Sequence, residues 1–372
     1  MFAILNDKQN KLFKKAKDFA ENYIVPNAEK WEEEAKLPQE LVEKLREAGF
    51  LGMMNPKSMG GSEMSYLDSV MVVEGIAYGD GGAAFFTELM NCVNYDLAVL
   101  YPENESVEGV INDITLCKKQ TCFCFTEKDA GTDPFLAETT AVETDGGFII
   151  NGEKTWASNC ADADYLLVWT KADNHKMFLF FVDAKAEGVK ITEIRKRLGG
   201  NLISSGTVAF ENVFVPAECL ISTDAYDLAM HTINIARIYV SAMAVGFAGR
   251  ALEITTEFLK ERKTFGKPVM KNQYVQFKLA DLAMKTEAAR CLLYNTVALL
   301  DKGDLDISKA APKVKLFCPE TAWEVTSECA HLFGGIGCEV NKEITRLMGN
   351  ASATRIEDGT SEVQRILIAK DL

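Results

Sequence analysis

Apolar residues recur every three or four positions along the first third of the chain, which is the spacing of helices buried along one face. The clearest apolar stripe consists of Leu12, Phe13, Ala16, Phe19, Ala20, Tyr23 and Ile24. Pro38 and Gly49 bracket a second helix, because proline is favoured in the first turn of a helix and glycine directly after the last turn. We therefore expect an N-terminal helical domain over residues 1–117.

The pattern changes near residue 118. Residues 118–221 contain short β-rich runs separated by turn sequences such as TDGG and RLGGN. One of these runs, GFIINGEKTWASN, predicts a hairpin that turns at Asn151 and Gly152, because this pair suits a two-residue turn with positive φ. We expect a middle β-domain, folded as a barrel or sandwich, over this range.

Helical spacing returns after residue 222, and the predicted helices are longer there. The segment ARIYVSAMAVGFAGRALEITTEFLKERKTFG keeps small and apolar residues on one face over many turns, and three further helices are expected after it. The order of helices, strands and helices predicts an α+β fold that ends in a C-terminal four-helix-bundle domain over residues 222–372.

The composition limits the classes of partner. With 372 residues, 48% of them hydrophobic, the chain can bury a large core divided into two or three lobes. Its formal net charge of −14 argues against a nucleic-acid partner, since binding to phosphate backbones needs clustered Lys and Arg. An anionic cofactor is still compatible with this charge, because a few basic residues and helix N-termini are enough to hold phosphates.

The cysteines and the apolar runs point to an intracellular protein. The ten cysteines lack the spacing of a metal site and only three histidines are present, so we expect no metal. Many unpaired thiols are typical of a reducing compartment, and the sequence MFAILNDKQNKLFKKAKDFA has no apolar core of a secretory signal. The longest apolar runs, YLLVW and MFLFFV, have the length of strands and cannot span a bilayer. We expect a cytoplasmic protein without membrane insertion.

Two adjacent acids, Glu357 and Asp358, precede the last predicted helix in the stretch RIEDGTSEVQRILIAK. Ser361 and Gln364 have the spacing of a capping box at the start of this helix. Acids are favoured at a helix N-terminus by roughly 0.3–1 kcal/mol each, because partial positive charge and free N–H groups gather there. The pair therefore has either this electrostatic role or a catalytic one.

Two loops in the β-domain have the composition of ligand-binding loops. FTEKDAGTD leaves a strand with hydroxyls at Thr126 and Thr132 and with a turn at Gly131 that exposes backbone N–H groups. KTWASN sets Trp156 beside small hydroxyl-bearing residues at a strand end. The alternatives are a plain connection for the first loop and a core tryptophan for the second.

Two helical-domain segments are further candidates for a cofactor site. In ERKTFGKPV, Arg262, Lys263 and Thr264 either bind pyrophosphate or are solvated. The glycines of HLFGGIGCE mark either a helix C-cap or close approach by a ligand. The match of residues 79–84 to G-x-G-x-x-A does not indicate a Rossmann site, because it follows a helical segment rather than a strand.

Taken in order, these segments resemble the acyl-CoA dehydrogenase family of FAD flavoproteins over essentially the whole chain. CFCFTEKDAGTD looks like the family's strand ending in Thr-Glu-Pro-x-Ala-Gly-Ser-Asp, and NGEKTWASN like its Asn-Gly-x-Lys-x-Trp-Ile-Thr-Asn. ERKTFGKPV is nearly the family sequence, and HLFGGIGCE and EDGTSEVQR are similar to its C-terminal signatures. Five such motifs in the family's order and spacing make the resemblance specific.

The resemblance implies that FAD is the cofactor and that several loops bind it. By this resemblance, one set of residues surrounds the flavin ring: Phe123, Cys124, Phe125, Thr126, Gly131, Thr132, Trp156, Ala157 and Ser158. A second set holds the pyrophosphate and adenosine of the FAD of a neighbouring subunit: Arg262, Thr264, Phe265, Gln273, His331, Phe333, Gly334 and Gly335. Thr360 and Glu362 would contact the nucleotide part of FAD.

The resemblance also implies contacts with an acyl-CoA substrate. Asn234 and Arg237, in HTINIAR, fall on positions that contact the CoA moiety, and Thr132 and Gly359 lie near the thioester. Glu88 lies with Asn91, Asn94 and Tyr95 on a segment that often lines the acyl pocket in the family. If these side chains point inward, a short or polar acyl group is expected; otherwise they form a solvated helix face.

Asp358 occupies the place where most members of the family carry the catalytic glutamate, one residue before Gly-Thr. The implied chemistry needs a carboxylate, because the hydrogen α to a thioester is a weak acid that only a well-placed base removes. A flavin ribityl hydroxyl and the Asp358 N–H would stabilise the thioester oxygen, while the β-hydride passes to flavin N5.

Aspartate is a departure from the family, since it is one methylene shorter than glutamate. A misplacement of about 1 Å can reduce a rate by roughly 10²-fold. Either the backbone shifts to bring Asp358 within reach, or Glu357 acts as an alternative base, or removal of the α-proton is not limiting, as in an enoyl-CoA reductase. Another base position known in some relatives is Ala236 in this chain, which closes that route.

The resemblance thus implies an FAD-dependent acyl-CoA dehydrogenase, a CH–CH oxidoreductase that interconverts an acyl-CoA and its 2,3-enoyl-CoA. Its implied partners are an electron-transferring flavoprotein and further copies of the chain, usually in a homotetramer. The alternatives are an enoyl-CoA reductase that runs the same reaction in reverse and a catalytically silent flavoprotein that serves as a scaffold subunit.

Overall fold

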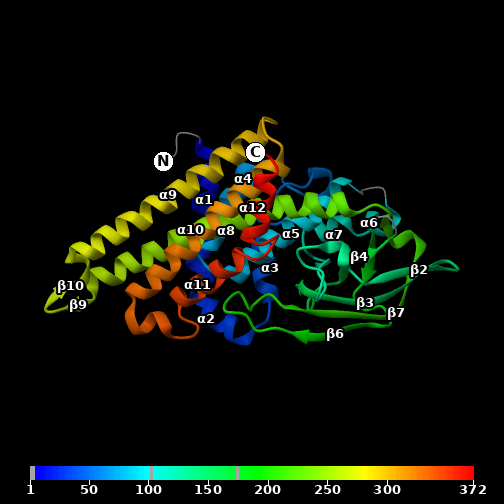
Figure 1. Ribbon diagram of the computed structural model, residues 1–372, viewed down its shortest axis with the longest axis horizontal. Coiled ribbons are helices and arrows are strands. Elements are labelled where there is room, and N and C mark those ends of the chain that lie inside the picture. The colour runs from blue at the N-terminus through cyan, green and yellow to red at the C-terminus, as the bar shows by residue number, and fades with distance from the viewer. Residues whose placement is uncertain (1–4, 101–103, 173–175) are drawn as a thin grey trace.

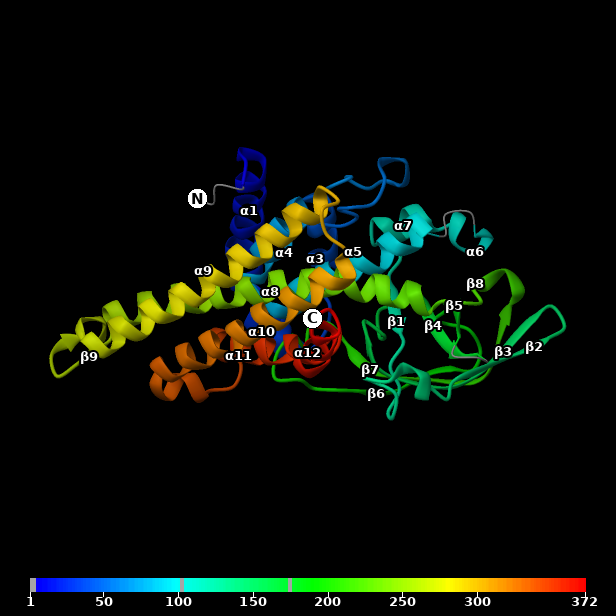
Figure 2. The same cartoon turned by 45° about the horizontal axis from the view of Figure 1, so that its top comes forward.

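The computed structural model describes residues 5–100, 104–172 and 176–372 of the protein. Helices, then strands, then helices follow one another along the chain, which confirms the predicted α+β order. The sheet lies at one end of the longest axis, and the hairpin between helices α8 and α9 reaches the other end (Figures 1 and 2).

The N-terminal part is helical as predicted. Its helices are α1 (Asp7–Phe19), a π-helical segment (Ala20–Ile24), α2 (Val25–Glu34), α3 (Gln39–Glu47), α4 (Tyr66–Ala77), α5 (Gly81–Leu100), α6 (Glu105–Glu108) and α7 (Ile111–Thr115). Helix α3 has Pro38 as its N-cap and is followed by Gly49 with a φ of 73°, as the sequence indicated.

Two glycines let α1 and the segment after it pack closely on α4. A Cβ at Gly75 would lie 2.5 Å from the Ala16 Cβ, and a Cβ at Gly79 would lie 2.7 Å from the Ile24 Cβ. Real Cβ atoms do not approach this closely, so larger residues at these positions would force the helices apart. The apolar stripe predicted over residues 12–24 therefore meets a groove formed by small residues.

The middle part is an eight-stranded, mostly antiparallel sheet. Its strands are β1 (Thr121–Cys124), β2 (Thr140–Thr144), β3 (Gly147–Ser158), β4 (Tyr165–Lys171), β5 (Met177–Asp183), β6 (Val189–Ile194), β7 (Ser205–Pro216) and β8 (Leu220–Ser222). The order across the sheet is β6-β7-β3-β2-β4-β5-β8, and β1 pairs in parallel with β4. The Thr155 N–H of β3 donates to the carbonyl of Thr126, two residues after β1, so the loop that follows β1 lies beside the last part of β3.

The predicted hairpin at Asn151 and Gly152 is wrong, because both residues lie inside the continuous strand β3. The register against β7 shifts between Ile150 and Gly152, and Gly152 has a φ of 146°. A Cβ at Gly152 would lie 2.5 Å from Thr139 Oγ1, so the glycine serves a bulge with close backbone approach.

The C-terminal part consists of long helices. They are α8 (Tyr226–Glu261), α9 (Gln273–Asp301), α10 (Ile307–Leu332), α11 (Glu343–Thr354) and α12 (Ser361–Ala369), with the short strands β9 (Lys263–Thr264) and β10 (Lys267–Pro268) at the tip between α8 and α9. Figure 1 shows α8, α9 and α10 running side by side, with α12 next to α10.

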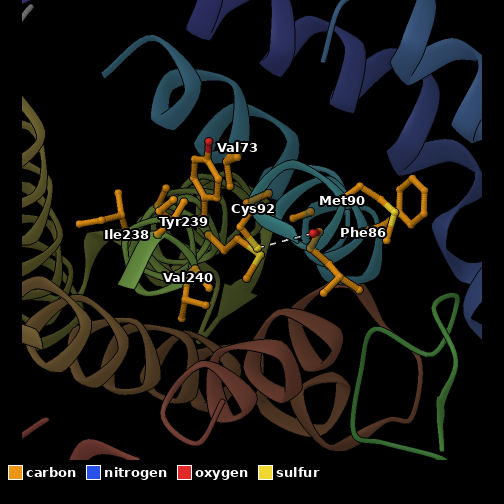
Figure 3. Packing of buried hydrophobic residues seen from close by; sticks show 14 of the residues in the cluster. Val73, Phe86, Met90, Cys92, Ile238, Tyr239 and Val240 are labelled. Carbon is orange, nitrogen blue, oxygen red and sulfur yellow. Dashed lines mark hydrogen bonds between the residues drawn. The ribbon is translucent and has the colours of Figure 1, made fainter. Parts of the chain in front are cut away.

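The core continues from the N-terminal helices into this bundle. Figure 3 shows apolar side chains of α4, α5 and α8 in contact: Val73, Phe86, Met90, Cys92, Ile238, Tyr239 and Val240. Among the helices that the structure describes, α8 alone is long and apolar enough to cross a bilayer, and 83% of that stretch is buried inside the protein. A helix buried to this extent is the central core helix of the fold.

Candidate active site

The turn that precedes α12 is held by side chains from three helices. Asp358 and Gly359 both have positive φ, of 53° and 90°. Arg237 Nε of α8 donates to the Asp358 carbonyl at 2.9 Å, and Lys315 Nζ of α10 donates to the Gly359 carbonyl at 2.6 Å. Gln364 Nε2 donates to the same two carbonyls at 3.2 and 2.8 Å. These bonds stabilise a left-handed conformation, which aspartate tolerates better than most residues.

Charged side chains from five segments gather around this turn. We call three of them the carboxyl cluster: Glu88, Glu357 and Asp358. Three cations act on Glu357 or Asp358 through their charge: Arg197, Arg237 and Lys315. Together, the carboxyl cluster and the three cations come from α5, the turn before α12, α8, α10 and the loop between β6 and β7.

Burial raises the pKa of the Asp358 carboxyl to about 6, although Lys315 and Arg237 act in the opposite direction. Burial and the adjacent Asp358 raise the pKa of Glu357 to about 7, against the charges of Lys315 and Arg197. A general base is most effective when its pKa lies near the working pH. Both carboxyls can therefore exchange a proton near neutral pH, so Glu357 keeps its place as the alternative base.

Glu88 is a carboxyl without a cation beside it. Its residue is 1% exposed, the Cys92 thiol donates to Oε1 at 3.3 Å, and Oε2 has no partner among the residues that the structure describes. Burial first, and then the negative charges of Asp358 and Glu357, raise the pKa of Glu88 well above its usual range. Burial therefore favours the uncharged form of this carboxyl, which can offer one O–H to an acceptor.

Two asparagines on α5 have structural roles instead. Asn91 accepts from the Met53 N–H at 2.8 Å and donates to the Phe50 carbonyl at 3.0 Å. Asn94 donates to the Ile114 carbonyl at 2.8 Å. Both are fully buried, so the interpretation as a solvated face is wrong for them, and their amides are occupied by the core.

Residues expected around the flavin ring form one surface where β1 and β3 end. The Thr155 N–H donates to the Thr126 carbonyl at 2.8 Å and joins the loop after β1 to β3. Trp156 has a φ of 55° and is 56% exposed, and the Arg195 guanidinium lies 4.8 Å from the centre of its ring. Thr126 and Ser158 are partly buried. An exposed indole and hydroxyl-bearing residues on adjoining segments fit a flat heterocycle with a polar rim, so these residues fit the expected flavin.

The remaining members of this set differ in exposure. Gly131 and Thr132 are exposed on the loop between β1 and β2, and Phe123 is half-buried. Three members have side chains turned into the core and can offer only backbone atoms: Cys124, Phe125 and Ala157.

A buried ion pair holds the loop between β1 and β2, and we call it the Lys154–Glu127 clamp. Lys154 Nζ donates to Glu127 Oε1 at 2.7 Å and to the Phe125 carbonyl at 3.0 Å. The Glu127 carboxylate also accepts from the backbone N–H groups of Glu138 at 2.6 Å and Thr139 at 3.1 Å. The clamp thus fixes both ends of the loop that carries the expected flavin contacts.

The second expected set of FAD contacts lies at the far end of α8. Arg262, Thr264, Phe265 and Gln273 are all exposed around the β9–β10 tip. With 36 residues, α8 is about 54 Å long, and the tip and the β-domain lie at opposite ends of the molecule (Figures 1 and 2). One FAD cannot reach both sets within a single chain.

The end of α10 joins this second set. Phe333 stacks on Phe258 of α8, with ring centroids 4.4 Å apart and an angle of 12° between the ring planes. His331, Gly334 and Gly335 are exposed beside it, and Gly334 has a φ of 65°. The structure therefore brings the two predicted loops of the second set to the same end of the bundle.

The start of α12 differs from the prediction. Its N-cap is Thr360, whose hydroxyl accepts from the Val363 N–H at 3.4 Å, so the predicted capping box of Ser361 and Gln364 is wrong. Ser361 Oγ donates to Glu320 Oε1 at 2.6 Å, and the Gln364 amide bonds to the preceding turn. Ser361 and Gln364 thus bond to other groups and do not cap the helix.

Asn234 and Arg237, which the resemblance assigns to CoA, bond to each other. Arg237 Nη1 donates to Asn234 Oδ1 at 2.8 Å, and both residues are buried. Through its Nε, Arg237 also supports Asp358, a role that the motif did not indicate. Contacts of these two residues with CoA, and of the exposed Glu362 with FAD, stay predictions.

Lys315, Arg197 and Gln364 were not found from the sequence as site residues. Only Lys315 has a signal there, because it shares a helix face with three buried residues: Ala311, Cys318 and Ala322. A lysine at a position where helical spacing calls for an apolar residue indicates a buried charge with a specific role. Arg197 and Gln364 have no comparable pattern around them.

Three family models match the chain in succession. Their descriptions are the N-terminal domain of acyl-CoA dehydrogenase at residues 6–101, the middle domain at 122–213 and the C-terminal domain at 226–372.

No group of three or more His, Cys, Asp or Glu side chains that could hold a metal ion is found in residues 5–100, 104–172 and 176–372.

Known proteins match over nearly the full length. The 3-(aryl)acrylate reductase of Clostridium sporogenes is 32% identical over 98% of this chain and 98% of that protein. The CarC subunit of the caffeyl-CoA reductase–Etf complex of Acetobacterium woodii is 30% identical over 97% of each. The structure of butyryl-CoA dehydrogenase from Megasphaera elsdenii aligns with a TM-score of 0.93 at 29% identity, covering 100% of this chain and 99% of that one.

Proposed function

Because the chain belongs to the acyl-CoA dehydrogenase family, we propose that it interconverts an acyl-CoA and its 2,3-enoyl-CoA, with Asp358 as the base. The chain is an FAD-dependent enzyme of that family. The observation that carries the assignment of the base is the turn before α12, in which Arg237, Lys315 and Gln364 hold the backbone of Asp358 and Gly359.

The residues of the chain would supply proton transfer and charge stabilisation. The Asp358 carboxylate removes the proton from the α-carbon of the acyl group. The Asp358 N–H has no acceptor among the described residues, so it is available to donate to the thioester oxygen, where negative charge develops. Bound FAD would supply the acceptor for the β-hydrogen, which leaves as a hydride with its bonding pair, while the electron pair left by the α-proton forms the C=C bond.

A second direction is supported by the relatives, two of which are named as reductases. In an enoyl-CoA reductase, protonated Asp358 would return the proton to the α-carbon. A pKa of about 6 supports either direction, because oxidation needs the carboxylate, which prevails above this pH, and reduction needs the acid, which prevails below it. The direction then depends on the acyl group and on the electron partner.

The proposal is tested with a panel of thioesters under anaerobic conditions. We expect at least one short or polar acyl-CoA to bleach the oxidised flavin, or its enoyl-CoA to restore the absorbance of the dithionite-reduced enzyme. The first result identifies a dehydrogenase and the second a reductase. A yellow protein that responds to no thioester in either direction would contradict the proposal and favour the scaffold alternative.

The acyl group is expected to carry an oxygen that accepts a hydrogen bond. Glu88 belongs to the same carboxyl cluster as Asp358, its burial favours the uncharged form with an O–H, and one of its oxygens has no partner in the described chain. A buried donor is costly when no acceptor is present, so it selects for a ligand that provides one. This supports a short, polar acyl chain rather than a long alkyl chain.

Replacing Glu88 with leucine should reverse this preference. We expect Glu88→Leu to lower kcat/KM for the best polar thioester by about 10- to 100-fold, because a buried hydrogen bond to substrate is lost. The value for a plain alkyl thioester of equal length should stay constant or rise. Glu88→Gln keeps a donor and serves as the control. An unchanged ranking of thioesters in Glu88→Leu would exclude Glu88 from substrate selection.

The second set of FAD contacts supports an assembly of several copies. Phe265 is fully exposed at the β9–β10 tip, and Arg262, Thr264 and Gln273 around it are exposed as well. In a homo-oligomer, expected to be a tetramer, this tip would reach the FAD of a neighbouring subunit. An electron-transferring flavoprotein would exchange electrons with the flavin. All ten cysteines are free thiols, which supports a reducing compartment such as the cytoplasm.

A further inference from the structure

Lys315 is a buried lysine whose ammonium group has a single hydrogen-bond partner among the described residues. Lys315 lies on α10 and is 0% exposed, and its Nζ donates to the Gly359 carbonyl at 2.6 Å. Removing an ammonium from water costs several kcal/mol unless nearby groups compensate for the loss. One carbonyl is weak compensation for a full charge, so the carboxyls around Lys315 must provide the rest.

Carboxyls and one further cation face this ammonium from the elements packed around α10. The turn before α12 contributes Asp358 and Glu357, α10 itself contributes Glu320, and α8 contributes Arg237. Burial lowers the pKa of Lys315 to about 8, while Asp358 and Glu357 raise it in compensation. In the other direction, Lys315 lowers the pKa of both carboxyls. Ammonium and carboxyls therefore titrate as one set.

The hydrogen bond from Lys315 duplicates support that the turn already receives from Gln364. Gln364 already donates to the Gly359 carbonyl at 2.8 Å and to the Asp358 carbonyl at 3.2 Å, and Arg237 supports the latter at 2.9 Å. An uncharged side chain would be sufficient to complete this pattern. What Lys315 alone brings to the turn from α10 is a positive charge, held at the carbonyl of Gly359, the residue next to Asp358.

We propose that Lys315 is a positioning residue whose buried charge, held at the carbonyl next to Asp358, keeps the Asp358 carboxyl in its charged, basic form. The proposal rests on Asp358 as the base of the proposed reaction. Without the ammonium, nothing on α10 offsets the burial of Asp358 and the repulsion within the carboxyl cluster. The carboxyl would then hold its proton to higher pH, and the fraction of active base at a given pH would fall.

Three substitutions separate the charge from the hydrogen bond. Lys315→Met removes both, Lys315→Gln keeps a donor without charge, and Lys315→Arg keeps a charge. Lys313→Met, two residues away on the exposed side of α10, is the matched control. If Lys315→Met does not fold, Lys315→Gln tests the same charge with a polar side chain.

The pH profile of kcat/KM provides the first measurement. In the oxidative direction we expect the acid limb of Lys315→Met and Lys315→Gln to move about one unit to higher pH, which is about a tenfold loss below pH 6 that recovers at higher pH. In the reductive direction the basic limb should move by the same amount and in the same sense. Lys315→Arg, which keeps the charge, should leave the acid limb at the parent pH, and Lys313→Met should keep the whole parent profile. A loss that is equal at every pH would reduce Lys315 to a structural residue.

An infrared pH titration of the purified holoenzyme provides a measurement that does not depend on turnover. The carboxyl band of Asp358 is identified as the band that is absent in Asp358→Asn. In Lys315→Gln this band should titrate about one unit above the parent protein. An unmoved band overturns the proposal for Lys315 even if the protein is active. If no thioester is turned over but the band moves, the charge effect of Lys315 stands and only the proposed function fails.

Discussion

Asp358→Asn should retain FAD and lose about 10³-fold in kcat/KM with the best thioester. A positioned general base contributes on the order of 10²–10⁴-fold to a rate, and asparagine keeps the size of the side chain without its basicity. The backbone bonds from Arg237, Lys315 and Gln364 go to carbonyls, so the turn should persist in the variant. The measurement is the rate of anaerobic flavin bleaching, or of its recovery with an enoyl-CoA.

Glu357→Gln is the matched control for this variant, because Glu357 is adjacent and also partly buried with a pKa near 7. Its kcat/KM should fall less than tenfold. If instead Glu357→Gln were the inactive variant and Asp358→Asn performed as well as the parent, the base would be Glu357. The family assignment would then be unaffected, but the role given to Asp358 would be excluded.

Lys154→Met should destabilise the β-domain by on the order of 3–5 kcal/mol, because it leaves the Glu127 carboxylate buried without its cation. Lys154 is fully buried and also supports the Phe125 carbonyl, so the loop between β1 and β2 should loosen as well. We expect a lower urea midpoint of unfolding and a preparation with reduced FAD content. Both are measured on the purified protein, by tryptophan fluorescence and by flavin absorbance.

The same domain contains an exposed pair that serves as a control. Lys190 and Glu211 form a salt bridge of 2.6 Å, with both side chains more than half exposed. Lys190→Met should cost less than about 1 kcal/mol, since water replaces the lost partner. A Lys154→Met variant that is no less stable than Lys190→Met would show that the clamp does not hold the loop.

The order of the domains and the long helices could be predicted because they depend on apolar spacing that extends over many residues. Helix α3 between Pro38 and Gly49 was confirmed for a different reason, because its two boundary residues act on the adjacent turns. The position of Asp358 in front of the last helix was also correct. Features that depend on residues close together in the sequence could therefore be predicted from the sequence.

The errors have a common cause, which is competition from partners that are distant in sequence. Asn151 and Gly152 have the residues of a hairpin turn, but Thr139 and the pairing with β7 make them part of a bulge. Ser361 has the spacing of an N-cap, but Glu320 on α10 takes its hydroxyl. Local preference did not predict either outcome, because the decisive contact comes from another element.

The charges of the site were the least predictable part. Lys315 and Arg237 contact the same turn only because α10 and α8 pack around it. No local sequence pattern indicates that these two residues lie close together. The interruption of an apolar helix face at Lys315 was the one available signal. It becomes informative when the face as a whole is considered rather than each motif alone.

Arg237 lies within the continuous helix α8, which ends at Glu261, and Arg262 directly follows the helix, twenty-five residues after Arg237. At 1.5 Å per residue these two positions are about 38 Å apart, with no hinge between them. The helix therefore holds Arg237 and Arg262 at a fixed distance from each other. Inserting four residues in its middle would lengthen it by about 6 Å and rotate one end by roughly 40°, so the two ends could no longer face their present surroundings.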